Sequence, residues 1–328
     1  QSASLMITLI LALLVWTKNI QYWHIVVLAT ALGFVNVLDM PTRQAFVIEL
    51  VGREDLMNAV ALNSSVFNMA RIIGPALAGI LMGYAGISVC FFLNSISFAA
   101  VVISLIFIKP IETHKGIPKS NKILVNIMDG LKYIYQSELL FSTILVMTIV
   151  GTFAMNFNVL VPVFAKEVLK QNEAGFGFLM SLMGIGSFMG AMLVATISKS
   201  GSKKLIHFIL FIVPLAIGLF LTGTGLTKSY LLTGLGLALS GLTFVSFGST
   251  ANSTMQLNST DEYRGRVMSV YSLVFAGSTP IGNLYAGSIA EHYGAGVGFA
   301  ACGLIIILLL IPVYIYRAKK TSQLLEPS

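Results

Sequence analysis

The chain has 328 residues, of which 56% are hydrophobic and only 10% are charged, and its formal net charge is +7. Its mean hydropathy is +0.87. A soluble domain has about 25% charged residues, so this chain has too few charges for a water-facing surface and we expect lipid around most of it. The positive charge does not indicate nucleic-acid binding, because it lies in short connectors and lacks an accompanying aromatic platform.

Ten apolar segments follow one another along the chain, most of them close to the roughly 20 residues that cross a membrane as a helix. Their apolar residues are continuous rather than alternating, which excludes the strands of a membrane barrel. We therefore expect an all-α membrane protein with helices over about residues 2–17, 22–42, 58–83, 87–108, 138–165, 175–198, 205–225, 229–256, 266–290 and 295–316.

Basic residues are divided unequally between alternate connectors. Fifteen Lys and Arg residues follow even-numbered segments, whereas only Lys18, Lys166, Lys170 and Lys228 follow odd-numbered ones. Basic residues in short loops stay on the cytoplasmic side. We therefore expect the start of the chain and the C-terminal tail over 317–328 to be cytoplasmic.

The connector over 109–137 is longer than the others and divides the chain into two halves. Within it, Ile123, Ile127, Leu131 and Ile134 recur at helical spacing beside lysines. This pattern is typical of a helix on the inner membrane surface, although a solvated linker of weak helicity is the alternative. We expect a bundle of four helices over 1–108, this connector, and a bundle of six helices over 138–316.

The two halves also resemble each other in sequence. When residues 52–86 are shifted by 208 positions onto 260–294, nine of 35 positions match. The matches include the glycine pairs Gly74 and Gly282, Gly79 and Gly287, and Gly86 and Gly294. Small residues set how closely helices approach, so we interpret the matches as an internal repeat. The helices over 138–198 have no counterpart in the first half, and we expect two further helices, in about 70 residues, upstream of Gln1.

Four motifs carry a resemblance to a known family. They are Asp39-Met-Pro-Thr-Arg43, Ala70-Arg71-Ile-Ile-Gly74-Pro75-Ala-Leu-Ala78-Gly79, Arg264-Gly265-Arg266-Val-Met-Ser269 and Gly277-Ser-Thr-Pro280-Ile-Gly282. Together with the two parallel repeats, they resemble the branch of the major facilitator superfamily that contains enterobactin exporters and other siderophore and drug exporters. The resemblance covers essentially the whole chain. It implies a bundle of twelve membrane helices, of which this chain holds ten, four in one half and six in the other.

The segment from Gly74 to Gly79 resembles the antiporter signature of these exporters. Pro75 removes a backbone donor and bends the helix, while the glycines let a neighbouring helix lie close. Ala78 stands where the family pattern has the first of two glycines. A kinked packing helix without a transport role is the alternative interpretation.

The resemblance also implies residues that gate the cytoplasmic side. Arg43 is the expected partner of an acidic residue in the first gate loop, and a simple topology charge is the alternative. Arg264 and Arg266, with Gly282 and Gly287, are the expected second-half counterparts. The pattern from Ser259 to Glu262 predicts a capping box that starts the helix of Arg264 and Arg266.

Polar side chains inside membrane helices should face a cavity or another helix. The candidates that we favour for contact with substrate or proton are Asn36, Asp39, Asn68, Asn156 and Asn158. The resemblance places the helix that opens the second half beside the central cavity, which favours Asn156 and Asn158. For each asparagine, hydrogen bonding between helices is the alternative.

Arg71 is the one strongly basic residue deep within an expected membrane helix, about 20 Å from the cytoplasmic edge near Asn58. It cannot lose its proton, so it needs water or an anion. Asp39 lies about 15 Å away in depth by the same helical rise. We expect Arg71 to face the cavity and meet water, an anionic substrate or a carboxylate upstream of Gln1. Hydrogen bonding to Asn68 and nearby carbonyls is the alternative.

Together these features predict a secondary active transporter that exports a siderophore or drug-like compound in exchange for protons, by alternating access. An importer or facilitator of the same fold, and a non-transporting receptor or scaffold, are the alternatives. We find no catalytic set and no phosphate-binding loop, so we expect no enzyme activity, no cofactor and no metal.

The expected partners are a small-molecule substrate, protons and the lipid bilayer, with no nucleic acid. We expect a monomer in the bacterial inner membrane.

Overall fold

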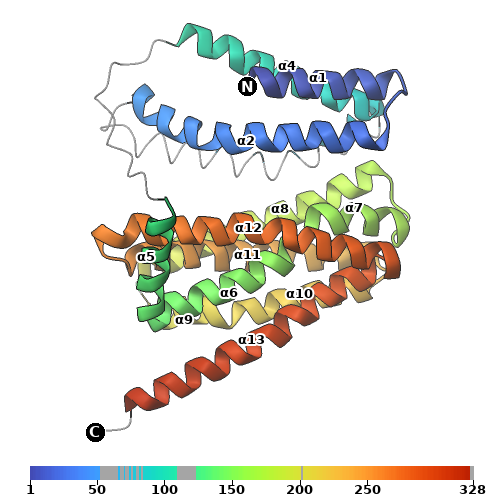
Figure 1. The fold of residues 1–328 in the computed structure, drawn as a ribbon. Coiled ribbons are helices and arrows are strands. Elements are labelled where there is room, and N and C mark those ends of the chain that lie inside the picture. Colours follow the sequence, from blue (N-terminus) through green and yellow to red (C-terminus); the bar gives the residue numbers. More distant parts are fainter. Residues whose placement is uncertain are drawn as a thin grey trace. The chain divides into compact units, whose positions relative to one another are not determined.

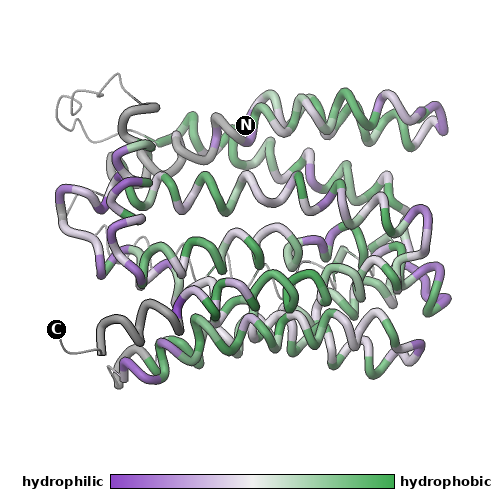
Figure 2. Tube along the Cα trace, turned by 60° about the horizontal axis from the view of Figure 1, so that its bottom comes forward, coloured by the Kyte–Doolittle hydropathy of each residue, from purple (hydrophilic) through white to green (hydrophobic). Residues whose placement is uncertain are grey.

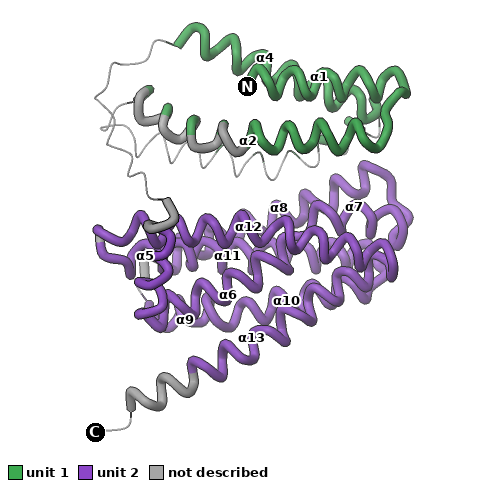
Figure 3. Tube along the Cα trace, viewed as in Figure 1, with its two compact units in different colours: residues 1–118 green, residues 119–328 purple. Residues whose placement is uncertain are grey.

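The computed structural model describes residues 1–51, 84–108, 123–200 and 202–325, together with 66, 70, 74, 77, 78, 81 and 82. All regular secondary structure in this described part is helical. The chain divides into two compact units, residues 1–118 and 119–328 (Figure 3).

The helices of both units follow the order of the expected apolar segments (Figure 1). Unit 1 contains α1 (Ser2–Trp16), α2 (Tyr22–Val51) and α4 (Ile87–Phe107). Unit 2 contains α5 (Ile123–Gln136), α6 (Glu138–Ala154), α7 (Phe157–Glu167), α8 (Glu173–Ser200), α9 (Lys203–Phe211), α10 (Val213–Leu226), α11 (Tyr230–Leu257), α12 (Asp261–Tyr293) and α13 (Ala295–Leu325). The expected helix over 58–83 lies mostly outside the described residues, so the total of ten membrane helices stays a prediction.

Six described segments are long and apolar enough to cross a membrane. They are Ile87–Phe107, Glu138–Glu167, Glu173–Ile197, Lys203–Leu226, Tyr230–Leu257 and Ala295–Arg317. Two shorter helical segments, Ser2–Trp16 and Tyr22–Asn36, are also apolar. In each unit, hydrophobic residues occupy the middle of the helices and hydrophilic residues gather near their ends (Figure 2). This distribution is that of a multi-pass membrane protein.

Two of the expected continuous helices are interrupted, which corrects the sequence prediction. The segment over 138–165 is divided into α6 and α7, and the segment over 205–225 is divided into α9 and α10. The second break has a simple cause, because Pro214 stands in the first turn of α10 and has no N–H to continue the ladder of α9. The Tyr314 hydroxyl donates to the carbonyl of Phe211 at this break.

Two helices of unit 2 begin with a side-chain cap that the sequence analysis did not single out, and the one cap that it predicted is absent. The Ser137 hydroxyl accepts from the N–H of Leu140 at the start of α6, and the Asn172 carbonyl accepts from the N–H of Gly175 at the start of α8. The expected capping box at Ser259 is wrong, since its hydroxyl donates to the carbonyl of Met255 at 2.6 Å. The residue before α12 is Thr260, whose side chain makes no capping hydrogen bond.

The expected internal repeat has a counterpart in the helix boundaries. The first residues of α2 and α11, Tyr22 and Tyr230, are 208 positions apart, as are Ile87 and Ala295, which begin α4 and α13. The residues before α4 and α13 are Gly86 and Gly294, with φ of 83° and 87°. Positive φ values of this kind favour glycine. The two halves thus share their turn conformation as well as their helix spacing.

In unit 1, α1 packs along α4 through small polar residues. The buried Ser95 hydroxyl donates to the Thr8 hydroxyl at 2.9 Å, and the Thr8 hydroxyl in turn donates to the carbonyl of Ser4 at 2.9 Å. Trp16 packs edge-on against Phe92 near the other end of α1. Small residues and hydroxyl groups of this kind join helices in membranes, where the hydrophobic effect does not.

In unit 2, glycines let the two most extensively packed helix pairs touch at their backbones. Along α8 and α11, a Cβ atom at Gly186 would overlap the carbonyl of Ala238, and one at Gly241 would overlap the carbonyl of Met183. Along α10 and α13, a Cβ atom at Gly225 would overlap the carbonyl of Gly296. Unit 2 therefore depends on close backbone contact, and added side-chain volume at these glycines must separate the helices.

We expect the Gly241→Ala variant to be less stable than the original protein by about 1–3 kcal/mol, because the new methyl group displaces α8 from α11. The matched control is Gly248→Ala on the same helix, where a Cβ atom meets no described atom within 4 Å. Thermal unfolding of the purified protein in detergent measures both variants. Equal unfolding temperatures for the two variants would contradict the close packing of α8 and α11.

Candidate functional site

The break between α6 and α7 lies within the first candidate span of unit 2. Helix α6 ends at Ala154 and α7 begins at Phe157, so that Met155 and Asn156 stand between them. Their backbone angles are −86° and 13°, and −91° and 15°. This part of conformational space is sparsely populated and recurs at functional positions.

The side chain of Asn156 takes the place of the missing backbone donors. Its amide nitrogen donates to the carbonyls of Thr152 at 3.2 Å and Phe153 at 3.3 Å, at the end of α6. The same nitrogen lies 3.6 Å from the sulfur of Cys302 on α13. An asparagine side chain that bonds to nearby carbonyls competes with the helical ladder, which accounts for the break in an otherwise apolar run.

Asn156 is only 2% exposed, and its carbonyl oxygen has no hydrogen-bond partner among the described residues. That oxygen points toward α12, because a Cβ atom at Gly282 would lie 2.8 Å from it. The same Cβ atom would overlap the carbonyl of Thr152. A glycine at position 282 is therefore required for α12 to pass the break at this distance.

Neighbouring residues of α12 also contact the break. The Thr279 hydroxyl lies 3.7 Å from the sulfur of Met155, and a Cβ atom at Gly151 would contact Ser278 at 3.4 Å. Pro280 lies between these residues and Gly282, where it removes one backbone donor from α12. The break, α12 and α13 thus form one joint, which we call the Asn156 joint: Thr152, Met155, Asn156, Thr279, Gly282 and Cys302.

The other predicted asparagines and Asp39 lie elsewhere. Asn158 is exposed on α7, two residues beyond the buried Asn156, and Asn36 is exposed on α2. Asp39 is half-buried and accepts a hydrogen bond from the side-chain amide of Gln1 at 2.6 Å. The structure therefore separates Asn156, which binds its own helices, from Asn158, which is available to a ligand or a neighbouring surface.

Several predicted residues fall outside the described part of the chain. They are Asn68, Arg71, Pro75, Gly79 and the side chain of Arg43. Gly74 is described, and no described atom would lie within 4 Å of a Cβ atom there. Gly287 is less crowded than Gly282, since its Cβ atom would lie 3.8 Å from Val159. The roles assigned to these residues from the sequence stay predictions.

Arg264 and Arg266 lie at the start of α12, and each contacts a different helix or its end: Arg264 contacts the end of α11, and Arg266 contacts α5. The Arg264 guanidinium donates to the carbonyls of Gln256 at 3.1 Å and Ser259 at 3.4 Å, at the end of α11. The Arg266 guanidinium pairs with Asp129 of α5 at 3.2 Å and lies over the ring of Tyr263. Both members of the ion pair are about one-third exposed or more, so the pair alone contributes at most about 1 kcal/mol.

Helix α5 crosses one end of unit 2 and is joined to α12 by more than this ion pair (Figure 1). The rings of Tyr133 and Tyr263 stack at 4.7 Å, and the Thr260 N–H donates to the Tyr133 hydroxyl oxygen at 3.1 Å. Gly130 allows this close crossing, because a Cβ atom there would lie 2.7 Å from the Arg266 carbonyl. We call this set the α5–α12 contact: Asp129, Gly130, Tyr133, Thr260, Tyr263 and Arg266.

The backbone hydrogen bond from Thr260 lowers the pKa of Tyr133 below its ordinary value, because a donor to the phenol oxygen favours the ionised form. The stripe predicted over 123–134 does form a helix, and Ile134 is buried in the core of unit 2. Sequence reasoning missed the polar side of this helix, where Asp129 and Tyr133 are four residues apart and so share one face.

Comparisons with known proteins agree with this architecture. A family model described as transmembrane secretion effector matches residues 1–327. The staphyloferrin A transporter of Staphylococcus aureus is 25% identical over 99% of this chain and 80% of its own. The multidrug efflux pump Tap of Mycolicibacterium fortuitum is 22% identical over 97% of this chain and 78% of its own. An enterobactin exporter, EntS of Shigella boydii, is 24% identical over 87% of this chain and 68% of its own.

A solved structure gives the same fold. The crystal structure of a bacterial homolog of the human lysosomal transporter Spinster, inward-facing and unoccupied, aligns with a TM-score of 0.67. The alignment covers 95% of this chain and 78% of that chain, with 11% sequence identity. At this identity the likeness concerns the fold alone. Among the described residues, no group of three or more His, Cys, Asp or Glu side chains could hold a metal ion.

We expect Asn156→Asp to destabilise unit 2 by at least about 2 kcal/mol at neutral pH. A carboxylate cannot donate to the carbonyls of Thr152 and Phe153, and it places a buried charge beside them. Asn158→Asp is the matched control because that side chain is exposed. Thermal unfolding in detergent should show the larger loss for Asn156→Asp, with partial recovery at low pH as the carboxyl group regains a donor. A larger loss for Asn158→Asp would contradict this account.

A second expectation concerns the α5–α12 contact. Tyr133→Phe keeps the ring stack but removes the acceptor for the Thr260 N–H, which should cost about 1 kcal/mol. Hydrogen exchange of the peptide around Thr260 should become faster. Tyr135→Phe, on the same helix but with a 68% exposed ring, should leave this exchange unchanged. If neither variant alters the exchange rate, the hydrogen bond between Tyr133 and Thr260 does not stabilise the start of α12.

Proposed function

Because this chain belongs to the transmembrane secretion effector family of major facilitator transporters, we propose that it exports a small molecule in exchange for protons, by alternating access. A member of this family is a multi-pass membrane transporter and not an enzyme. The proposal concerns the direction of transport, the substrate and the coupling ion. It also places the protein in a bacterial inner membrane as a monomer with a cytoplasmic C-terminus.

The observation that carries the proposal is the Asn156 joint. Alternating access needs membrane helices that bend or slide without exposing backbone groups to lipid. The joint meets that need, because the Asn156 amide satisfies two carbonyls at the break, and Gly282 has no side chain to interlock with the break where α12 passes it.

The relatives support export and the class of substrate. Two of them are named for efflux or export, of drugs and of enterobactin, and a third is named for transport of staphyloferrin A. Siderophores carry carboxylate or catecholate groups, so we propose an anionic siderophore or a drug-like compound as the substrate. Asn158, exposed on the helix of the joint, is the described residue that we favour for contact with it.

Proton coupling requires a group that titrates within the membrane. Asp39 is the one acidic residue in the four expected helices of the first half, and it lies half-buried on α2. We propose Asp39 as the proton carrier and Arg71 as the residue that attracts the anionic substrate. Asn36, one turn from Asp39, and Asn68, one turn from Arg71, complete the proposed set.

Everted membrane vesicles test this function directly. With an acidic interior, an exporter should accumulate a labelled catecholate siderophore or a fluorescent drug-like dye inside the vesicles, and a protonophore should abolish the accumulation. Uptake by right-side-out vesicles alone would establish import instead. Lack of movement of either compound in both orientations, with the protein correctly inserted, would favour the receptor or scaffold alternative.

We expect Arg71→Gln to abolish accumulation in the everted vesicles while membrane insertion stays intact, since glutamine lacks the charge that attracts an anion at this depth. Arg53→Gln removes the same charge from the expected connector that precedes the helix over 58–83, and it should retain most of the activity. Transport by Arg71→Gln at the level of Arg53→Gln would show that Arg71 has no role in substrate binding or coupling.

A further inference from the structure

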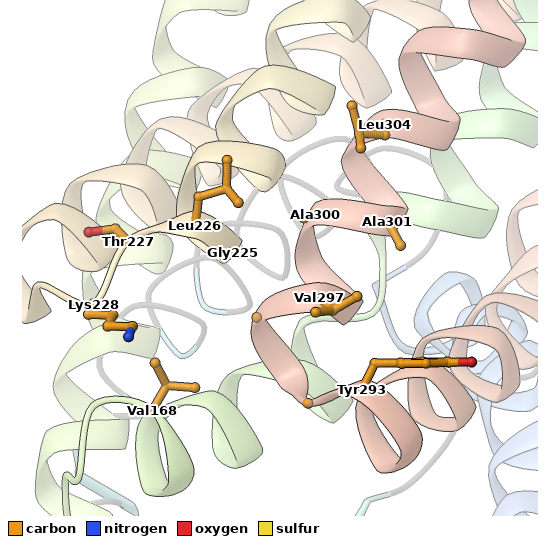
Figure 4. Close-up of a pocket in the computed structure, with 12 residues that line it drawn as sticks. Val168, Gly225, Leu226, Thr227, Lys228, Tyr293, Val297, Ala300, Ala301 and Leu304 are labelled. Atoms are coloured by element: carbon orange, nitrogen blue, oxygen red, sulfur yellow. The ribbon is translucent and has the colours of Figure 1, made fainter.

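An apolar groove lies at the end of unit 2 opposite α5, where α10 is followed by α11 and α12 by α13 (Figures 1 and 4). Its cavity volume is about 410 Å³. The lining is formed mostly by glycine and aliphatic side chains, among them Val168, Leu226, Val297 and Leu304. The groove is therefore suited to hydrocarbon rather than to a polar solute.

One cationic side chain belongs to the described lining. Lys228 stands in the short connector between the candidate spans Lys203–Leu226 and Tyr230–Leu257, across the groove from Val297 and Tyr293 (Figure 4). A residue between two membrane spans lies at the membrane surface, where a lipid headgroup lies. The exposed Tyr293 is typical of the same interface. The groove thus combines an apolar floor with one positive charge at its mouth.

The apolar floor continues along α13. Leu304, which lines the groove, is followed by Leu308, Ile311 and Ile315 at helical spacing, and these four side chains are 50%, 60%, 46% and 52% exposed in the structure. From Leu304 to Ile315 this stripe is about 16 Å long. That length is close to half of the ~30 Å hydrocarbon core of a bilayer, the thickness of one leaflet.

We propose that the groove binds an anionic phospholipid of the leaflet at this end of unit 2. The headgroup phosphate pairs with the Lys228 ammonium, and one acyl chain lies in the groove and along the α13 stripe. The charge selects an anionic over a zwitterionic headgroup, because juxtamembrane basic residues attract anionic lipid. The exposed stripe on a candidate span selects a lipid over a water-soluble anion, since free phosphate gains nothing from aliphatic side chains.

Native mass spectrometry of the detergent-solubilised protein tests whether the Lys228 charge contributes to lipid binding. The probes are phosphatidylglycerol and phosphatidylcholine at equal concentration. We expect Lys228→Gln to weaken retention of phosphatidylglycerol about five-fold, the effect of about 1 kcal/mol for one interfacial lysine, with phosphatidylcholine unchanged. Lys166→Gln removes the same charge from an exposed residue at the same end of the unit, outside the groove, and should have no effect. Equal losses of phosphatidylglycerol retention in the two variants would overturn the proposal. Such a result would mean that the lysines attract anionic lipid without a specific site.

A second pair of variants tests the groove itself. Ala301→Phe fills the lining and should reduce retention of both lipids, because the acyl chain loses its place. Ala100→Phe adds the same ring to an exposed position on α4 and should change neither. Retention unaltered by Ala301→Phe, in protein with an unchanged unfolding temperature, would overturn the proposal. Displacement of bound lipid by the transported compound would overturn it too, since the groove would then be a substrate site.

Discussion

A membrane helix can be interrupted only where protein atoms replace the hydrogen bonds that its backbone loses, because lipid offers none. In the first span of unit 2 that demand falls on Asn156. Its amide nitrogen serves two carbonyls of α6 and lies near the sulfur of Cys302, while its own carbonyl oxygen lacks a partner among the described residues. A leucine could fill the same space but could not satisfy the end of α6. The position of the break is therefore set by this one side chain.

The surroundings of Asn156 determine what kind of motion the break allows. Gly282 brings the backbone of α12 against the carbonyl of Thr152, and a break confined in this way cannot open widely. It can shear, because helices in contact through glycine have no interlocking side chains at that point. Close packing of α8 with α11 and of α10 with α13 makes the rest of unit 2 stiff by comparison. The break at Asn156 thus lies outside the two most extensively packed helix pairs of the unit.

The helices were predictable from the sequence, because length and continuous apolar character are sufficient to mark a membrane segment. The matches between 52–86 and 260–294, Gly86 and Gly294 among them, also made the repeat visible, and the helix starts at Tyr22 and Tyr230 share the same 208-residue spacing. The family assignment drawn from the motifs around Gly74 and Gly282 is confirmed by the match over residues 1–327.

The break at Asn156 was not predictable, since hydropathy averages over a window and one asparagine in an apolar run does not change the average. Nor could spacing alone separate Asn156 from Asn158. Asn156 stands at the break and is buried, whereas Asn158 lies in the first turn of α7 and is exposed. The Ser259 error has a similar origin, because the hydroxyl had a second acceptor available in the preceding turn of α11.

Helix α12 connects the distinct features of unit 2. Its first turns carry the contact with α5, its middle carries Gly282 at the Asn156 joint, and its last residue, Tyr293, borders the apolar groove. At 33 residues it is about 50 Å long and continuous, apart from the donor lost at Pro280. A shear of α12 at Gly282 must therefore be accommodated at both of its ends. At one end the stacked rings of Tyr133 and Tyr263 and the ion pair of Arg266 with Asp129 hold α12 against α5. At the other end Tyr293 borders a groove lined mostly by glycine and aliphatic side chains. The end of α12 beside α5 is therefore the more firmly held of the two.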